Sequence, residues 1–148
     1  VQAAIGLEAL GLLDNWTATT QRHARQLGAT LAGSPGGQTP VVPDDCEHVS
    51  YQYCVGVPDR ADVIRHAIRR GVDVETLHVD VCTRLSLFGP PRWCASADRA
   101  AQAVQLRVYE SLTDEQISRV ARVVVEALTS ESPTAAPSGA PSLPGSRS

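Results

Sequence analysis

The sequence predicts an α+β fold, in which a long N-terminal helix precedes a small sheet of three or four strands with helices on one face. Three observations predict it. Residues 1–32 contain no proline and follow a helical pattern. Residues 51–57 and 106–109 are short runs rich in valine and tyrosine, as strands are. The segments between and after these runs carry capping residues and apolar residues at helical spacing.

The predicted connecting helix covers residues 1–32. Its first part is apolar on nearly every side, and a helix of that kind is usually covered by protein on several sides. We expect a break near Asp14 and Asn15, followed by a half-exposed second part. The glycine- and proline-rich residues 33–37 end the helix.

The first predicted strand covers residues 51–57, YQYCVGV. Large and small side chains alternate along it, which predicts a strand with one face in the core, including Tyr51 and Tyr53. The next helix begins after the N-cap Asp59 and ends at Gly71. Its expected inner stripe consists of Ala61, Ile64, Ala67 and Ile68.

The second half of the domain is predicted to contain a strand, an irregular stretch, a small helix, a strand and a final helix. The first four cover residues 72–74, residues 77–93, a helix capped by Ser96, and residues 106–109. The last helix has a capping box, with Thr113 as N-cap and Gln116 three residues later.

The tail at residues 129–148 consists mainly of Pro, Ser, Ala and Gly. It has almost nothing to bury, and we expect it to be disordered. The predicted organisation is therefore a connecting helix at 1–32, a small domain at 33–128 and a tail.

Composition excludes several classes of function. The chain has 148 residues, 43% hydrophobic and 20% charged, as in an ordinary water-soluble domain. The net charge of −3 argues against nucleic acid or an anionic membrane as the main partner. Neither a membrane span nor a signal peptide is evident, which favours a cytoplasmic location.

All basic residues are arginines, and the sequence contains no lysine. A Schiff base, an amine nucleophile and a P-loop lysine all require a side-chain amine. The chain alone can supply none of them.

A series of short motifs resembles the C-terminal segment of the DegT/DnrJ/StrS family of pyridoxal-phosphate (PLP) dependent sugar aminotransferases. The resemblance lies in the residues of the motifs and in their order along the chain. The series begins with QAAIGL at residues 2–7 and continues with Leu13-Asp14. The other members are residues 51–60, 70–72, 100–101, 106–109 and 112–116. The resemblance covers about residues 1–128 and includes the small domain of a fold-type-I PLP enzyme.

The resemblance implies a longer enzyme whose large N-terminal domain holds PLP on a lysine. Such enzymes transfer an amino group, usually from glutamate, to a nucleotide-linked keto sugar, and they act as dimers. The PLP lysine has no counterpart here, so the resemblance assigns no catalytic residue to this chain. It implies a wall of the substrate pocket, part of the dimer contact and no activity alone.

Two residues are candidates for substrate contact, and neither is assigned to a metal. His78 lies at or beside the family's His-Tyr-Pro or Leu-Trp motif, with Glu75 and Asp80 close in sequence. Arg84 is suited to a phosphate or carboxylate as a bidentate donor. The alternative for both is an ordinary solvated side chain. The motif's tyrosine and proline are missing, and Arg107 stands where the family commonly has proline.

Two further hypotheses remain open. The apolar surface of residues 3–13 also suits an interaction module that docks onto a full-length or split partner. Cys46, His48 and Cys54 are of the types that bind zinc, although their spacing matches no closed structural site. We expect the four cysteines to be reduced and mostly buried, and Trp93 to pack against its own loop.

Overall fold

The computed structural model describes residues 1–76 and 81–130 and confirms the predicted α+β fold. The elements follow in the order α1 (Gln2–Leu31), β1 (Tyr53–Gly56), α2 (Arg60–Arg69), β2 (Glu75–Thr76), η1 (Cys82–Arg84), η2 (Ser86–Phe88), α3 (Ala95–Ala100), β3 (Ala103–Leu106) and α4 (Asp114–Thr129). Within these residues no helix is long and apolar enough to cross a membrane.

The sheet has three antiparallel strands in the order β1-β3-β2, so β3 is central. Gln105 of β3 pairs with Cys54 of β1 on one side and with Glu75 of β2 on the other. Successive side chains of a strand point to opposite faces. These three residues therefore share one face, and the buried Val104 and Leu106 occupy the other.

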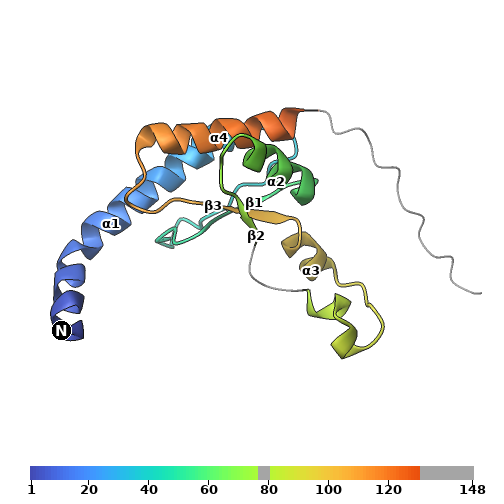
Figure 1. The fold of residues 1–148 in the computed structure, drawn as a ribbon, viewed down its shortest axis with the longest axis horizontal. Helices are drawn as coiled ribbons and strands as arrows, with labels where there is room; N and C mark the ends of the chain where they lie inside the picture. Colours follow the sequence, from blue (N-terminus) through green and yellow to red (C-terminus); the bar gives the residue numbers. More distant parts are fainter. Residues whose placement is uncertain (77–80, 131–148) are drawn as a thin grey trace, which may run out of the picture.

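Helices α1, α2 and α4 cover the face that carries Val104 and Leu106, whereas α3 lies beyond the end of the sheet with the η1 and η2 turns (Figure 1). Helix α4 contacts both α1 and α2. The core between the layers contains the fully buried Leu27, Leu31, Val55, Val104, Leu106, Ile117, Ala121 and Val124.

Helix α1 is a continuous helix of 30 residues, so the predicted break at Asp14 and Asn15 is wrong. Both side chains are exposed, and water satisfies their polar groups without disturbing the backbone. Only the C-terminal half reaches the core. The N-terminal half extends past the sheet (Figure 1), and the expected cover over it is not provided by the described residues.

The predicted helix signals are confirmed where they are local. The Asp59 carboxylate accepts a hydrogen bond from the Asp62 N–H at 2.9 Å and caps α2. Thr113 and Gln116 form the reciprocal capping box of α4, with distances of 3.2 and 2.8 Å. Gly71 follows α2 with φ 69°, a left-handed conformation that glycine adopts without strain.

Other boundaries differ from the prediction. Ser96 does not cap α3, because the helix begins at Ala95 and its N-cap is Cys94, two residues earlier. The strand predicted at 72–74 lies instead at 75–76, and that predicted at 106–109 lies at 103–106. Val72 and Val74 are buried without belonging to a strand, so their apolar pattern reports burial rather than pairing.

Two predicted apolar patterns are only partly correct. In α2 the inward residues are Val63 and Ala67, with Ile64 partly buried, and Ala61 and Ile68 are exposed. Tyr53 lies in the core as predicted, but Tyr51 is 83% exposed. The alternation fails there because Ser50 has φ 54°, which turns the backbone just before β1.

Candidate functional site

Of the two sequence-predicted substrate contacts, only Arg84 lies among the described residues. His78 lies outside them. Arg84 lies in η1, where its guanidinium pairs with the carboxylate of Asp98 in α3. The Arg84 side chain is 58% exposed. The pair links the η1 turn to α3, and substrate binding by Arg84 stays a prediction.

The hypothetical metal site is not formed. In the part of the chain that the structure describes, no three His, Cys, Asp or Glu side chains come together as metal ligands. His48 uses Nδ1 to accept a hydrogen bond from the Ser50 N–H at 2.8 Å. This bond holds the turn before β1 rather than a ligand.

The cysteines are free thiols but less buried than expected. Cys46 and Cys82 are exposed, and Cys54 and Cys94 are half-buried. Cys54 is at a position of the sheet where desolvation by burial raises the pKa of its thiol. Trp93 is 83% exposed, so it does not pack against its own loop as predicted.

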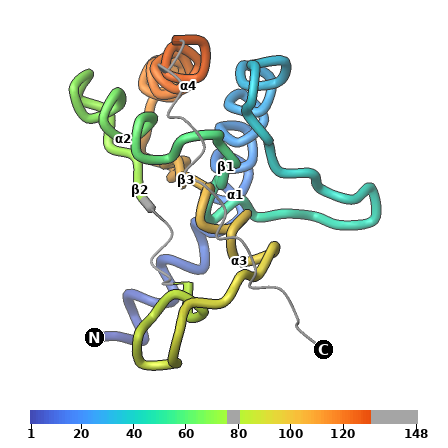
Figure 2. Tube along the Cα trace, turned by 90° about the vertical axis from the view of Figure 1, so that its right-hand side faces the viewer, coloured from blue at the N-terminus to red at the C-terminus, as the bar shows by residue number. Residues whose placement is uncertain are grey.

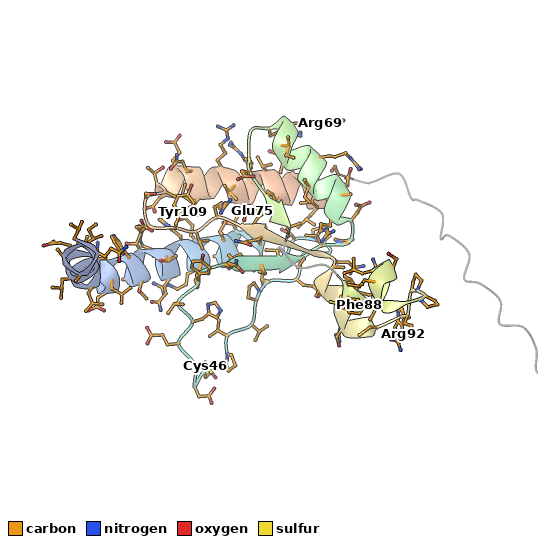
Figure 3. The ribbon with its side chains drawn as sticks, turned by 60° about the horizontal axis from the view of Figure 1, so that its bottom comes forward. Cys46, Arg69, Glu75, Phe88, Arg92 and Tyr109 are labelled. Carbon is orange, nitrogen blue, oxygen red and sulfur yellow. The ribbon has the colours of Figure 1, made fainter. Side chains whose placement is uncertain are left out.

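The larger of two grooves beside α1 has a volume of about 810 Å³. One wall is α1, and the other is the connection between α1 and β1, which projects from the sheet with Cys46 near its tip (Figures 2 and 3). Gln21 holds this connection to α1, because its Nε2 donates to Glu47 Oε1 at 3.1 Å and to the His48 carbonyl at 3.2 Å.

The smaller groove has a volume of about 440 Å³ and lies between α1 and the end of β3. Its lining includes three aromatic side chains, whereas that of the larger groove includes only Tyr53. Trp16 comes from α1, Tyr51 from the residues before β1, and Tyr109 from the connection between β3 and α4. Figure 3 shows Tyr109 on this connection.

A buried histidine fixes the connection that carries Tyr109. His23 of α1 is fully buried, with Nδ1 3.4 Å from the Val108 carbonyl oxygen and Nε2 3.5 Å from Asp114 Oδ1. Arg22 pairs with the same carboxylate. The hydrogen bond from Arg22 holds the pKa of Asp114 below its usual range, with a smaller contribution from the Arg22 charge. The cluster joins α1 to the start of α4.

The cation beside the smaller groove is already paired. The Arg107 guanidinium bonds to Glu75, and its Nη2 lies 3.5 Å from Asp73 Oδ2. The positive charge of Arg107 at the edge of the smaller groove is therefore neutralised by these two carboxylates. The position where the family commonly has proline is here the centre of an ion-pair network.

The groups present do not fit covalent attachment of PLP. Its imine requires a lysine, and the sequence contains none. Arg107, the arginine lining the smaller groove, is engaged by two carboxylates and is poorly suited to a phosphate. These residues can form walls around a substrate but cannot hold the cofactor as an imine.

Sequence reasoning missed the smaller groove. The third strand was predicted at residues 106–109, so Gln105 was not expected to belong to a strand. The prediction therefore gave no reason to expect Gln105 in the same groove as Trp16. Tyr51 was assigned to the core for its alternation with Tyr53. The groove forms only when α1, the residues before β1 and the end of β3 meet in the folded chain, which no single segment reveals.

Comparison with known proteins identifies relatives. The model of the DegT/DnrJ/EryC1/StrS aminotransferase family matches residues 1–125. The crystal structure of DesV from S. venezuelae has a TM-score of 0.79 and 27% identity, covering 88% of this chain and 37% of that chain. The sugar aminotransferase CalS13 from Micromonospora echinospora has a TM-score of 0.71 and 25% identity, covering 83% and 34%.

A third structure supports the fold alone. The aminotransferase TlmJ from Streptoalloteichus hindustanus has a TM-score of 0.75 at 24% identity, covering 85% of this chain and 35% of that chain. No curated protein matches. The chain thus spans little more than a third of the length of the solved structures that it resembles.

Proposed function

Because this chain belongs to the DegT/DnrJ/EryC1/StrS aminotransferase family, as its sequence predicts, we propose that it acts as the small domain of a PLP-dependent sugar aminotransferase. The observation that carries the proposal is the family match over residues 1–125, which includes α1, all three strands and most of α4. The proposed reaction moves an amino group, typically from glutamate, to a nucleotide-linked keto sugar in the cytoplasm.

The proposed contribution of this chain is a wall of the substrate pocket. Family members depend on a PLP lysine, and no residue here can replace it. The chain alone is therefore catalytically silent, and activity requires a PLP-binding domain. His78 and Arg84 stay candidates for contact with the substrate.

The proposed partner surface is the N-terminal half of α1. Ile5 is 64% exposed, Leu7 72% and Leu10 69%, which is unusual for neighbouring large apolar side chains. Covering them removes apolar area from water and favours association. We assign this surface to a PLP-binding domain, in a homodimer or in a complex with a separate partner chain.

A second candidate function rests on the same surface. A non-catalytic module that docks onto a full-length or split partner would need the exposed half of α1 and no chemistry. The two candidates differ in whether the docked complex transfers an amino group.

A chimera tests both. Residues 1–130 replace the corresponding C-terminal segment of CalS13, and three samples are compared: CalS13, the chimera and the chain alone with PLP. We expect the chimera to hold PLP and to aminate the CalS13 sugar substrate. The chain alone should form no PLP adduct that borohydride makes permanent.

The outcomes separate the candidates. A borohydride-stable adduct on the chain alone would overturn the proposal that it lacks the cofactor site. A chimera that folds and retains PLP but transfers no amino group would favour the docking module.

A further inference from the structure

The larger groove beside α1 contains two buried hydroxyl groups that the fold does not use. Tyr53 of β1 is only 6% exposed, yet its hydroxyl forms no hydrogen bond with the described residues. Ser50, just before β1, is 8% exposed, and its hydroxyl likewise has no partner in the described part of the chain. Both residues line the groove. Buried polar groups are almost always paired, so two unused hydroxyls on one wall point to a ligand.

Helix α1 leaves space in front of the Tyr53 hydroxyl. A Cβ atom at Gly28 would lie 3.1 Å from the hydroxyl oxygen, which is tighter than an ordinary van der Waals contact. The missing side chain at Gly28 therefore leaves room beside this oxygen. Burial raises the pKa of Tyr53, so the hydroxyl stays protonated at neutral pH and can donate a hydrogen bond.

His48 adds a third donor to the same groove. Its Nδ1 accepts a hydrogen bond from the Ser50 N–H at 2.8 Å. A neutral imidazole that accepts at Nδ1 carries its proton on Nε2, so His48 offers an Nε2–H group. The same bond holds Ser50 at φ 54°, a conformation that residues other than glycine rarely adopt. The donor-bearing wall is thus fixed before any ligand binds.

Arg25 supplies a free positive charge on the opposite wall. It lies one turn before Gly28 in α1, lines the groove and forms no ion pair with the described residues. A free guanidinium binds a carboxylate through two parallel hydrogen bonds. The Glu47 carboxylate also lines the groove and accepts a hydrogen bond from Gln21. Its charge disfavours a ligand with two or more negative charges, so a monoanion fits best.

The groove has room for more than a carboxylate. Its volume of about 810 Å³ lies in the range of small-molecule sites. Ala24, Pro40 and Val42 add apolar surface to its lining. A ligand that fills it therefore carries an apolar body beside its charged group.

We propose that the larger groove binds a small monocarboxylic acid, with the carboxylate on Arg25 and the Tyr53 hydroxyl and an apolar body against Pro40 and Val42. This site lies apart from the smaller groove and goes beyond the proposed function, because it requires neither PLP nor a sugar. Arg25 belongs to α1 and Tyr53 to β1. The bound acid links the helix to the sheet and stabilises the folded chain.

The test uses the full 148-residue chain, labelled with ¹⁵N and titrated with 3-phenylpropionate at neutral pH. The amide signals of Gly28 and Ser50 report binding in the groove by NMR. 3-Phenylpropionamide has nearly the same shape without the charge and is the matched ligand control. We expect saturable shifts in about the millimolar range with the acid. The amide should bind about tenfold more weakly, because it loses the hydrogen bonds to a charged group.

Three variants complete the test. Arg25→Gln should weaken binding of the acid about tenfold. Tyr53→Phe removes only the hydroxyl and should weaken binding about fivefold, yet resist urea as well as its parent, because the hydroxyl has no partner in the fold. Arg122→Gln is the matched control, since Arg122 is an exposed arginine of α4 that does not line this groove, and it should leave binding unchanged.

Several results would overturn the proposal: no saturable shift with the acid, equal affinity for the amide, or unchanged binding by either Arg25→Gln or Tyr53→Phe. A destabilised Tyr53→Phe chain would show that the hydroxyl serves the fold. Tighter binding of glutamate or inorganic phosphate would refute the assignment to a monocarboxylic acid. None of these measurements involves the chimera, so the proposed function and this site stand or fall separately.

Discussion

Two leucines of α1 provide a matched test of where the domain ends and its free surface begins. Leu27 is fully buried and Leu10 is 69% exposed, although both lie in the same continuous helix. The perturbation is the same at each, Leu→Ala, which changes helix propensity little. Any large difference in unfolding free energy therefore reports packing.

The expected magnitude follows from burial. Removing three carbons from Leu27 loses roughly 2.4 kcal/mol at about 0.8 kcal/mol per methylene. The cavity left in the core raises the total to about 3–5 kcal/mol. Leu10 already faces water, so its truncation should change the unfolding free energy by less than about 0.5 kcal/mol.

The assay is urea unfolding followed by circular dichroism at low protein concentration, where association contributes little. The calculation would be refuted if Leu27→Ala lost less than about 1 kcal/mol. Equal losses at both positions would show that the exposed half of α1 is buried in this chain's own assembly.

Three further predictions concern single positions. Thr113→Ala removes the cap of α4 and should lower the unfolding free energy by about 1 kcal/mol, whereas Thr129→Ala at the other end should be nearly neutral in the same urea measurement. Gly71→Ala forces a side chain into φ 69° and should destabilise by about 1–2 kcal/mol; Gly6→Ala, in open space within α1, should raise helicity instead. The lowered pKa of Asp114 means that the folded state binds this proton more weakly than the unfolded state, so its stabilising effect is present at neutral pH and disappears as the solution is acidified. Asp114→Asn should therefore flatten the decline of stability between about pH 5 and pH 3 in urea titrations, and an unchanged slope would contradict this account.

Local sequence signals predicted the caps of α2 and α4 correctly because the causes of these caps are local. The side chains of Thr113 and Gln116 each accept a hydrogen bond from the other's backbone N–H within one turn. The Asp59 carboxylate caps α2 by accepting a hydrogen bond from the N–H of Asp62. Strand limits were less predictable because pairing decides them. Gln105 belongs to β3 through its partners in β1 and β2, not through its own polarity.

The candidate site was predictable only at the level of the family. The residues of the short motifs and their order along the chain indicated the aminotransferase family, and the family match over residues 1–125 confirms it. The aromatic groove depends on tertiary contacts. Trp16 and Tyr109 are far apart in sequence, and the turn at Ser50 that exposes Tyr51 comes from a backbone angle that alternation cannot reveal.

The uninterrupted length of α1 has a mechanical consequence. Its C-terminal half is fixed in the core from His23 onward, and about 20 residues precede that anchor, or roughly 30 Å of helix. A 10° rotation of the sheet and its helices would then sweep the far end of α1 through roughly 5 Å, by simple leverage on that length. A partner bound to Ile5 and Leu7 would therefore move when the whole domain tilts. In the same way, a displacement of that partner would tilt the domain.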